Sequence, residues 1–219
     1  MRCSIFFVVA VTAALFATAS AANRIKRSPL KVSVYYESHC PDSKYFINSQ
    51  LHPYFCKVRQ YLNLNLVPFG KASSTGEGDF TCQHGPKECR GNTIHNCVLK
   101  RLQDPKSQVD YVNCAFYDPD QPGLIEKTCV EQSGLDAQDI NKCYASEEGY
   151  MLMLNAENET KTMTPGPLFV PTIVFDDKYN DEDQKNAFRN FESTLCEKLI
   201  KHGYIEVCSH GVIINPEVC

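Results

Sequence analysis

Residues 32–43, Val-Ser-Val-Tyr-Tyr-Glu-Ser-His-Cys-Pro-Asp-Ser, place a cysteine between an apolar strand and a helix, and the rest of the chain is organised around this stretch. The run over residues 30–36 predicts a strand. Pro41 suits the first position of a helix, because its ring fixes φ and its missing N–H is not needed there. Cys40 is then the N-cap, and the unpaired backbone N–H groups and positive helix end favour its thiolate form. The stretch therefore predicts a nucleophilic cysteine.

The segments that follow predict a β-α-β unit. Residues 41–57 carry an apolar stripe at helical spacing, and Pro53 is expected to bend this helix. Residues 62–67, Leu-Asn-Leu-Asn-Leu-Val, alternate apolar and polar side chains and predict a second strand, parallel to the first. Residues 71–79 are polar and rich in serine and glycine, which predicts a flexible loop.

The second half of the chain predicts a helical insertion and then a return to the sheet. Periodicity is helical from about residue 92 to 158, and Asp-Pro, Pro-Gly and Ser-Gly pairs separate the helices. Residues 168–175 have strand character, and a short further strand is expected within 176–180. Asp181 is expected to cap a final helix that ends near Gly203.

The N-terminus predicts export from the cytosol. Residues 1–21 contain a basic start, an apolar run and small residues, the pattern of a signal peptide. Residues 22–27 end in a basic site, which fits a short propeptide, although a simple basic tail fits equally well. Residues 28–219 are then one domain, which includes the insertion over about 82–158. The only long apolar run is too short to span a bilayer, so stable membrane insertion is not expected.

Charge argues against polyanionic partners. The formal charge of the whole chain is −4. Residues 1–27 contain four positive and no negative side chains, so their removal leaves a formal charge of −8. This negative charge argues against nucleic acid and anionic membranes as partners. The sequence does not indicate an oligomeric state.

The cysteine count predicts disulfides and at least one unpaired thiol. Twelve cysteines are present, and Cys3 leaves with the signal peptide, so eleven remain in an oxidising compartment. Cys40 is the expected unpaired thiol, because its local sequence activates it, while Cys219 at the chain end is the alternative. Spacing does not reveal the pairing. The structural disulfide candidates are Cys56, Cys82, Cys89, Cys97, Cys114, Cys129, Cys143, Cys196, Cys208 and Cys219.

Two further motifs bear on metal binding and on modification. Cys82, Cys89, Cys97 and His84 offer zinc-ligand types, but their spacings match no common zinc motif and export favours disulfides, so no metal is expected. Asn158 lies in Asn-Glu-Thr, the one N-glycosylation sequon.

Three segments carry a resemblance to a known family. They are residues 36–43, Cys-Gln-His-Gly-Pro-Lys-Glu-Cys-Arg-Gly-Asn at 82–92 with Cys97 after it, and Phe-Val-Pro-Thr-Ile-Val at 169–174. With these segments the chain resembles the gamma-interferon-inducible lysosomal thiol reductase family. The resemblance extends over roughly residues 31–200. It implies an α/β fold, with a thioredoxin-like β-α-β … β-α core and a helical insertion stapled by disulfides. It also implies that Pro171 is a cis-proline beside the active-site sulfur, where it shapes the substrate groove.

The resemblance implies a thiol-disulfide reductase that acts on protein disulfides, secreted or lysosomal, with no bound cofactor. The family's usual active site is Cys-x-x-Cys, whereas residue 43 of this chain is serine. Ser43 is expected to hydrogen-bond to the Cys40 thiolate but cannot resolve a mixed disulfide, so an external thiol such as glutathione or cysteine is expected to do so. A non-catalytic binding protein therefore stays open as an alternative. A saposin-type lipid-binding domain would explain only the helical insertion.

Two neighbours of Cys40 are expected to tune its ionisation. Pro41 fixes the start of the helix, and His39 would favour the thiolate if it carried a proton. A solvent-exposed histidine without such a role is an equally good interpretation of His39. Asp42 acts in the opposite direction, because a nearby negative charge disfavours a thiolate.

Overall fold

A computed structural model describes residues 27–76, 78–116, 122–163, 166 and 169–214. The predicted signal peptide, most of the predicted propeptide and Cys219 lie outside the described residues. Among the described residues, no helix combines the length and the apolar character that crossing a bilayer requires.

A three-stranded sheet forms the centre of the fold, with strand order β2-β1-β5. β1 (Leu30–Tyr36) pairs in parallel with β2 (Leu62–Pro68) and antiparallel with β5 (Thr172–Phe175). The parallel pairing of the first two strands was predicted from the β-α-β pattern and is confirmed. β5 begins four residues later than expected.

The first crossover is helical from residue 41 to residue 61, with a change of helix type in the middle. It consists of α1 (Pro41–Tyr45), the π-helical η1 (Phe46–Leu51), α2 (His52–Val58) and the 3-10 turn η2 (Arg59–Tyr61). Pro53 stands at the start of α2. Its missing N–H and its ring are incompatible with a regular α-helical turn before it, which accounts for the π-helical segment there.

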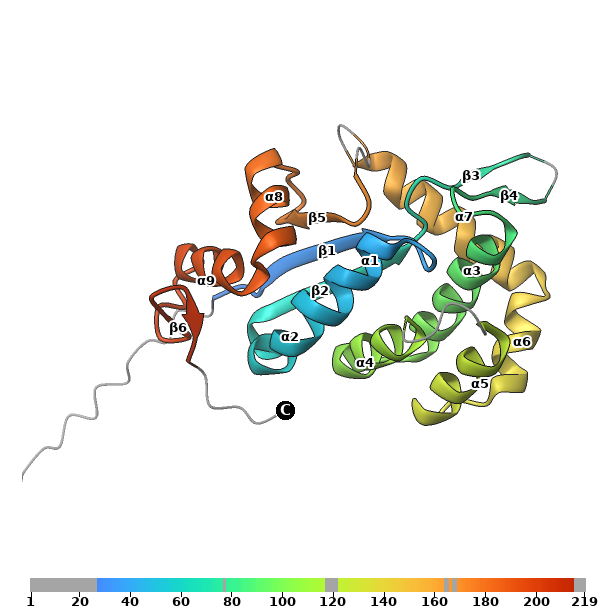
Figure 1. Cartoon of the computed structure of the whole chain (residues 1–219), viewed down its shortest axis with the longest axis horizontal. Helices are drawn as coiled ribbons and strands as arrows, with labels where there is room; N and C mark the ends of the chain where they lie inside the picture. The colour runs from blue at the N-terminus through green and yellow to red at the C-terminus, as the bar shows by residue number, and fades with distance from the viewer. Residues whose placement is uncertain (1–26, 77, 117–121, 164–165, 167–168, 215–219) are drawn as a thin grey trace, which may run out of the picture.

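Five helices form the predicted insertion and lie together at one side of the sheet (Figure 1). They are α3 (Pro86–Arg101), α4 (Pro105–Ala115), α5 (Pro122–Gln132), α6 (Ala137–Tyr144) and α7 (Glu147–Thr162). Disulfides join α3 to α6 through Cys97–Cys143 and α4 to α5 through Cys114–Cys129. The insertion is therefore cross-linked internally, as expected.

The predicted flexible loop over residues 71–79 is instead part of a short hairpin. β3 (Ser73–Ser74) pairs antiparallel with β4 (Phe80–Thr81). The Phe80 ring packs against Phe69 and Tyr150, with ring centroids 6.1 and 5.5 Å away. The prediction was wrong because this long-range aromatic packing leaves no signal in the polar sequence of the segment.

Two helices replace the single C-terminal helix that was predicted. They are α8 (Asp181–Arg189) and α9 (Phe191–Lys201), and they are followed by the small hairpin of β6 (Cys208–Ser209) and β7 (Val212–Ile213). Asn190, at φ −148° and ψ 82°, interrupts the helix, and its side chain accepts the Ser193 N–H to cap α9. The N-cap of α8 is Asn180 rather than Asp181.

The strand expected within 176–180 is a turn. Phe175 and Lys178 form a single isolated bridge, and Asp176 and Asp177 have φ values of 49° and 59°. Residues in this left-handed region do not continue a strand.

Candidate active site

Cys40 lies between β1 and α1, at the N-cap position that the sequence predicted. Its φ and ψ are −78° and 123°, and Pro41 follows at the first helical position. The Cys40 N–H donates to the Glu37 carbonyl at 3.2 Å, and the Cys40 carbonyl accepts the Lys44 N–H at 3.0 Å. Cys40 is the free cysteine among the described residues, and its side chain is largely buried. Strand end and helix start therefore hold one unpaired sulfur in a fixed position.

Val170, the residue before Pro171, lies next to this sulfur on the segment that leads into β5. The Val170–Pro171 peptide bond is cis, and Cys40 Sγ lies 3.7 Å from the Val170 carbonyl oxygen. The buried side chain of Gln184 on α8 holds the segment by accepting the Ile173 N–H at 2.7 Å and donating to the Pro171 carbonyl at 2.9 Å. Gln184 was not predicted, because a single polar residue on a helix gives no signal of such a role.

Ser43 is fully buried one helical turn beyond Cys40. Its hydroxyl accepts the Glu37 N–H at 3.3 Å. No hydrogen bond between Ser43 and Cys40 is found among the described residues. The Ser43 hydroxyl instead links α1 to Glu37, the residue after β1. The side chain is nonetheless inside the fold, on the helix that carries the sulfur.

His39 is half-buried directly before Cys40. Burial lowers the pKa of the imidazole, which the negative charge of Glu88 only partly opposes. Its Nε2 atom is buried without a hydrogen-bond partner. The His39 ring therefore gains a proton only at a lower pH than an ordinary histidine. Pro41, on the other side of Cys40, occupies the helix start that the sequence predicts.

The first turns of α3 hold the loop that carries Cys40. Asn92 Oδ1 accepts the Ser38 N–H at 2.8 Å, and the Ser38 hydroxyl donates to the Glu88 carbonyl at 3.1 Å. Gly91 permits this approach, since a Cβ atom there would lie 2.4 Å from Ser38 Oγ. The sequence resemblance singled out the block at 82–92 but gave no reason for it, and the structure places it against the active-site loop.

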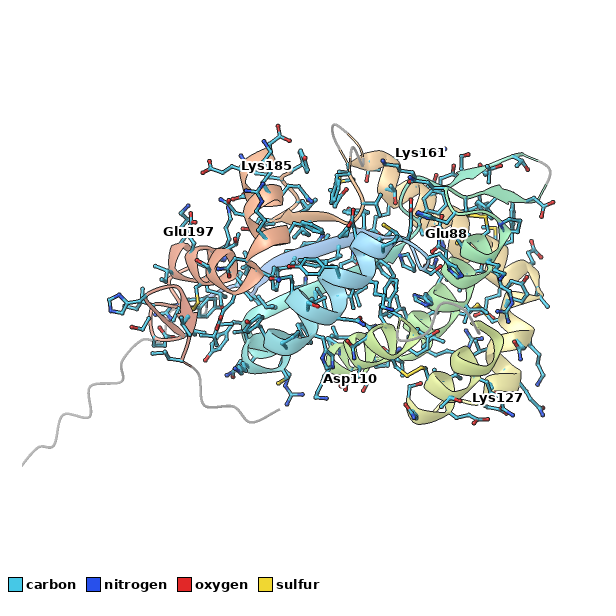
Figure 2. All side chains as sticks on the ribbon, in the orientation of Figure 1. Glu88, Asp110, Lys127, Lys161, Lys185 and Glu197 are labelled. Carbon is cyan, nitrogen blue, oxygen red and sulfur yellow. A yellow bond between two sulfur atoms is a disulfide. The ribbon has the colours of Figure 1, made fainter. Side chains whose placement is uncertain are left out.

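Two buried carboxylates and one imidazole meet beside this loop. His84 Nδ1 lies 2.5 Å from Glu88 Oε2 and 3.4 Å from Glu37 Oε2. Burial raises the pKa of Glu37, and the charge of Glu88 adds to this, while a hydrogen bond from the Lys71 N–H acts in the opposite direction. Figure 2 labels Glu88, which lies near the start of α3. Sequence analysis did not predict Glu37 or Glu88, because a carboxylate becomes notable only when its burial is known.

The structural disulfide candidates form four disulfides in which both partners are described, and the structure supplies the pairing that the sequence left open. The four bonds are Cys82–Cys89, Cys97–Cys143, Cys114–Cys129 and Cys196–Cys208. Cys56 is also disulfide-bonded. The zinc alternative for Cys82, Cys89 and Cys97 is therefore excluded, since all three sulfurs are in disulfides.

Known proteins share both the sequence and the fold of this chain. The family model for gamma interferon inducible lysosomal thiol reductase matches residues 31–133. A gamma-interferon-inducible lysosomal thiol reductase-like protein of Anopheles gambiae is 37% identical over 188 residues, which cover 79% of this chain and 78% of that protein. The gamma-interferon-inducible lysosomal thiol reductase of Carassius auratus is 32% identical over 197 residues, or 86% of this chain and 76% of that protein.

Among solved structures, Chlamydia trachomatis DsbA superposes with a TM-score of 0.58 at 14% sequence identity, covering 83% of this chain and 90% of that one. This similarity confirms the predicted thioredoxin-like fold. The sequence matches extend over most of the chain and include both the Cys40 loop and the block at 82–92. The chain belongs to the gamma-interferon-inducible lysosomal thiol reductase family.

Proposed function

We propose that this protein is a thiol-disulfide oxidoreductase that reduces protein disulfides through Cys40. The observation that carries the proposal is the position of the one free described cysteine, at a helix start and 3.7 Å from the Val170 carbonyl oxygen. Backbone N–H groups at a helix start stabilise the thiolate, which is the attacking species in disulfide exchange. Family membership and the thioredoxin-like fold support the same class of reaction.

The reaction starts when the Cys40 thiolate attacks one sulfur of a substrate disulfide. The substrate S–S bond breaks, a mixed disulfide forms between Cys40 and the substrate, and the departing sulfur takes up a proton. An external thiol such as glutathione or cysteine then attacks Cys40 Sγ and releases the second substrate thiol. A second external thiol frees Cys40 and leaves as its own disulfide. The net reaction converts one substrate disulfide and two external thiols into two substrate thiols and one external disulfide.

Two residues are proposed to support Cys40. Pro171 shapes the groove in which the substrate chain lies, since its segment borders the sulfur. Ser43 is proposed as the partner of the thiolate form. Its hydroxyl proton is available for this contact, because the hydroxyl oxygen acts as the acceptor in its bond with the Glu37 N–H.

We place the protein in a secreted or lysosomal location, with residues 1–21 as signal peptide, 22–27 as a short propeptide and 28–219 as one domain. The disulfides among the described residues support an oxidising route of synthesis. Asn158 is proposed to carry a glycan, and its exposed position on α7 leaves room for one.

A second candidate function is that of a catalytically weak binding protein, in which Cys40 forms a lasting mixed disulfide. Ser43 favours this alternative, because a hydroxyl cannot take the place of the resolving thiol.

Reduction of insulin by the purified protein, at acidic and neutral pH and with and without glutathione, tests the two functions. Repeated turnover that requires glutathione and disappears in Cys40→Ser supports the reductase. A single stoichiometric reaction that glutathione does not extend supports the binding protein. Activity that survives in Cys40→Ser contradicts both.

A further inference from the structure

Glu37, His84 and Glu88 form a compact set of ligand-type side chains that the proposed reaction does not use. We call this set the Glu–His–Glu cluster. Its three potential ligand atoms, one from each side chain, all lie within 4.8 Å of one another. The three residues come from the loop after β1, the turn before α3 and the first turn of α3. Separate segments therefore bring one nitrogen and two carboxylate oxygens to one point.

The cluster contains a buried carboxylate oxygen without a hydrogen-bond donor. The side chains of Glu37 and Glu88 are fully buried. Glu37 Oε1 accepts the Lys71 N–H at 2.8 Å, but Glu37 Oε2 has no hydrogen-bond partner. His84 Nδ1 is 3.4 Å away from Glu37 Oε2 and is hydrogen-bonded to Glu88 instead. A buried carboxylate is costly unless it is hydrogen-bonded, paired or coordinates a metal, so a bound cation would satisfy this oxygen.

We propose that the Glu–His–Glu cluster binds a divalent transition metal ion, with Zn²⁺ as the best fit, through His84 Nδ1, Glu37 Oε2 and Glu88 Oε2. Zinc takes imidazole nitrogen and carboxylate oxygen ligands at about 2.1 Å, and in a tetrahedral site these ligands lie roughly 3.4 Å apart. The His84–Glu37 separation of 3.4 Å already matches this geometry. The His84–Glu88 contact of 2.5 Å would have to open when the ion takes the place of the hydrogen bond between the two groups.

The surroundings of the cluster resemble those of a metal site in two respects. The backbone N–H groups of Lys71 and His84 bind the other oxygens of Glu37 and Glu88, at 2.8 and 3.2 Å, which fixes the orientation of both carboxylates. The His84 side chain is 33% exposed, so an ion can reach the cluster from solvent and keep a water in the fourth position. Calcium and magnesium prefer sites made of oxygen alone, so the imidazole favours zinc.

Zinc titration of the full secreted protein by calorimetry at pH 7.5 tests the proposal, without an added histidine tag. Cys40→Ser serves as the parent, because a free thiolate would bind zinc on its own. One zinc per chain is expected. Glu37→Gln, Glu88→Gln and His84→Ala should each weaken this binding at least tenfold, because each removes a ligand. Cobalt titration should give the visible spectrum of a tetrahedral site and lose it in the same variants.

His202→Ala is the matched control. His202 also contacts a carboxylate, with Nε2 lying 2.6 Å from Asp176 Oδ2, but this carboxylate is exposed rather than buried. Its removal should leave zinc affinity unchanged. Near-UV circular dichroism of each variant checks the fold. His84→Ala is the decisive variant, because the His84 side chain is partly exposed and its loss should disturb the fold least. Absence of zinc binding by the folded parent, or equal affinity in folded His84→Ala, would overturn the proposal. Either result leaves the reductase proposal intact, because zinc binding is measured without disulfide exchange.

Discussion

Cys40 Sγ and the Val170 carbonyl oxygen lie 3.7 Å apart although 130 positions separate the two residues in sequence. The contact joins the loop after β1 to the segment that precedes β5, and the antiparallel pairing of these strands holds it in place. A substrate chain that approaches the sulfur therefore meets a backbone segment with a fixed orientation.

Alkylation of the native protein should modify Cys40 alone. The sulfur is unpaired, whereas the other described cysteines are in disulfides and have no thiol to react. Treatment with iodoacetamide without reductant, followed by peptide mapping, measures the outcome. Cys40→Ser provides the blank. Modification at another position, with Cys40 recovered in an internal disulfide, would refute the assignment.

Ser43→Cys should raise disulfide reductase activity at low external thiol. A thiol on the same helix acts at an effective concentration of order millimolar or more, so at about 0.1 mM glutathione the gain should be roughly tenfold or greater. Initial rates of insulin reduction against glutathione concentration provide the measurement. Ser43→Ala, which loses the bond to the Glu37 N–H without adding a thiol, is the control. Equal rates for Ser43→Cys and the parent at every glutathione concentration would show that residue 43 has no part in resolution.

Gly91→Ala should destabilise the fold and slow alkylation of Cys40. The added Cβ would lie 2.4 Å from Ser38 Oγ and 3.0 Å from Ser38 Cβ, so either the Ser38 hydroxyl must leave its bond to the Glu88 carbonyl or the active-site loop must shift. Crowding of this kind costs about 1–3 kcal/mol, and the better helix propensity of alanine returns up to about 1 kcal/mol of it. Urea unfolding measures the net loss. In a Ser38→Ala background the cost should shrink, and an unchanged cost there would show that Ser38 is not the obstacle.

His95 should make the protein less stable as pH falls below neutrality. Burial lowers the pKa of His95 from 6.5 to about 3, so the folded protein keeps the ring neutral, hydrogen-bonded to the Tyr36 hydroxyl at 3.0 Å. The unfolded chain takes up a proton below about pH 6.5 while the folded chain does not, and at pH 5 this imbalance costs about 2 kcal/mol. Below about pH 3 the folded protein is protonated too, and the loss levels off.

The difference in unfolding free energy between the parent and His95→Gln tests this effect. The difference should shift by about 2 kcal/mol in favour of the variant between pH 7 and pH 5, because glutamine has no proton to gain. The comparison needs no assumption about the stability of the variant at pH 7. If the two proteins lose the same free energy over this range, the titration of His95 does not contribute.

Local sequence was sufficient for the parts of the fold that local forces determine. Leu30–Tyr36 and the helix that begins at Pro41 were predicted with nearly correct ends, because strand periodicity and the conformational limits of proline act within a few residues. The break at Asn190 was missed, because the apolar stripe runs through it and only the capped structure shows that the helix restarts.

The residues of the candidate site were likewise predicted where nearby sequence marks them and missed where it does not. Cys40 was identified from its own neighbours, and Pro171 from resemblance to a family. Glu37, Glu88 and Gln184 were not identified, because each owes its role to burial against another segment of the fold. A buried glutamate and an exposed one look alike in a sequence, and only the packing of α3 against the active-site loop distinguishes them.

Capture of a mixed disulfide tests the central claim most directly. The unmodified protein contains the attacking thiol Cys40 but not a resolving thiol at position 43, so mixing it with a disulfide-containing substrate without external thiol should trap the intermediate. Intact-mass and peptide analysis should find one substrate linked to Cys40, released on addition of glutathione and far less abundant with Ser43→Cys. Absence of the adduct, or its attachment to another cysteine, would contradict the account.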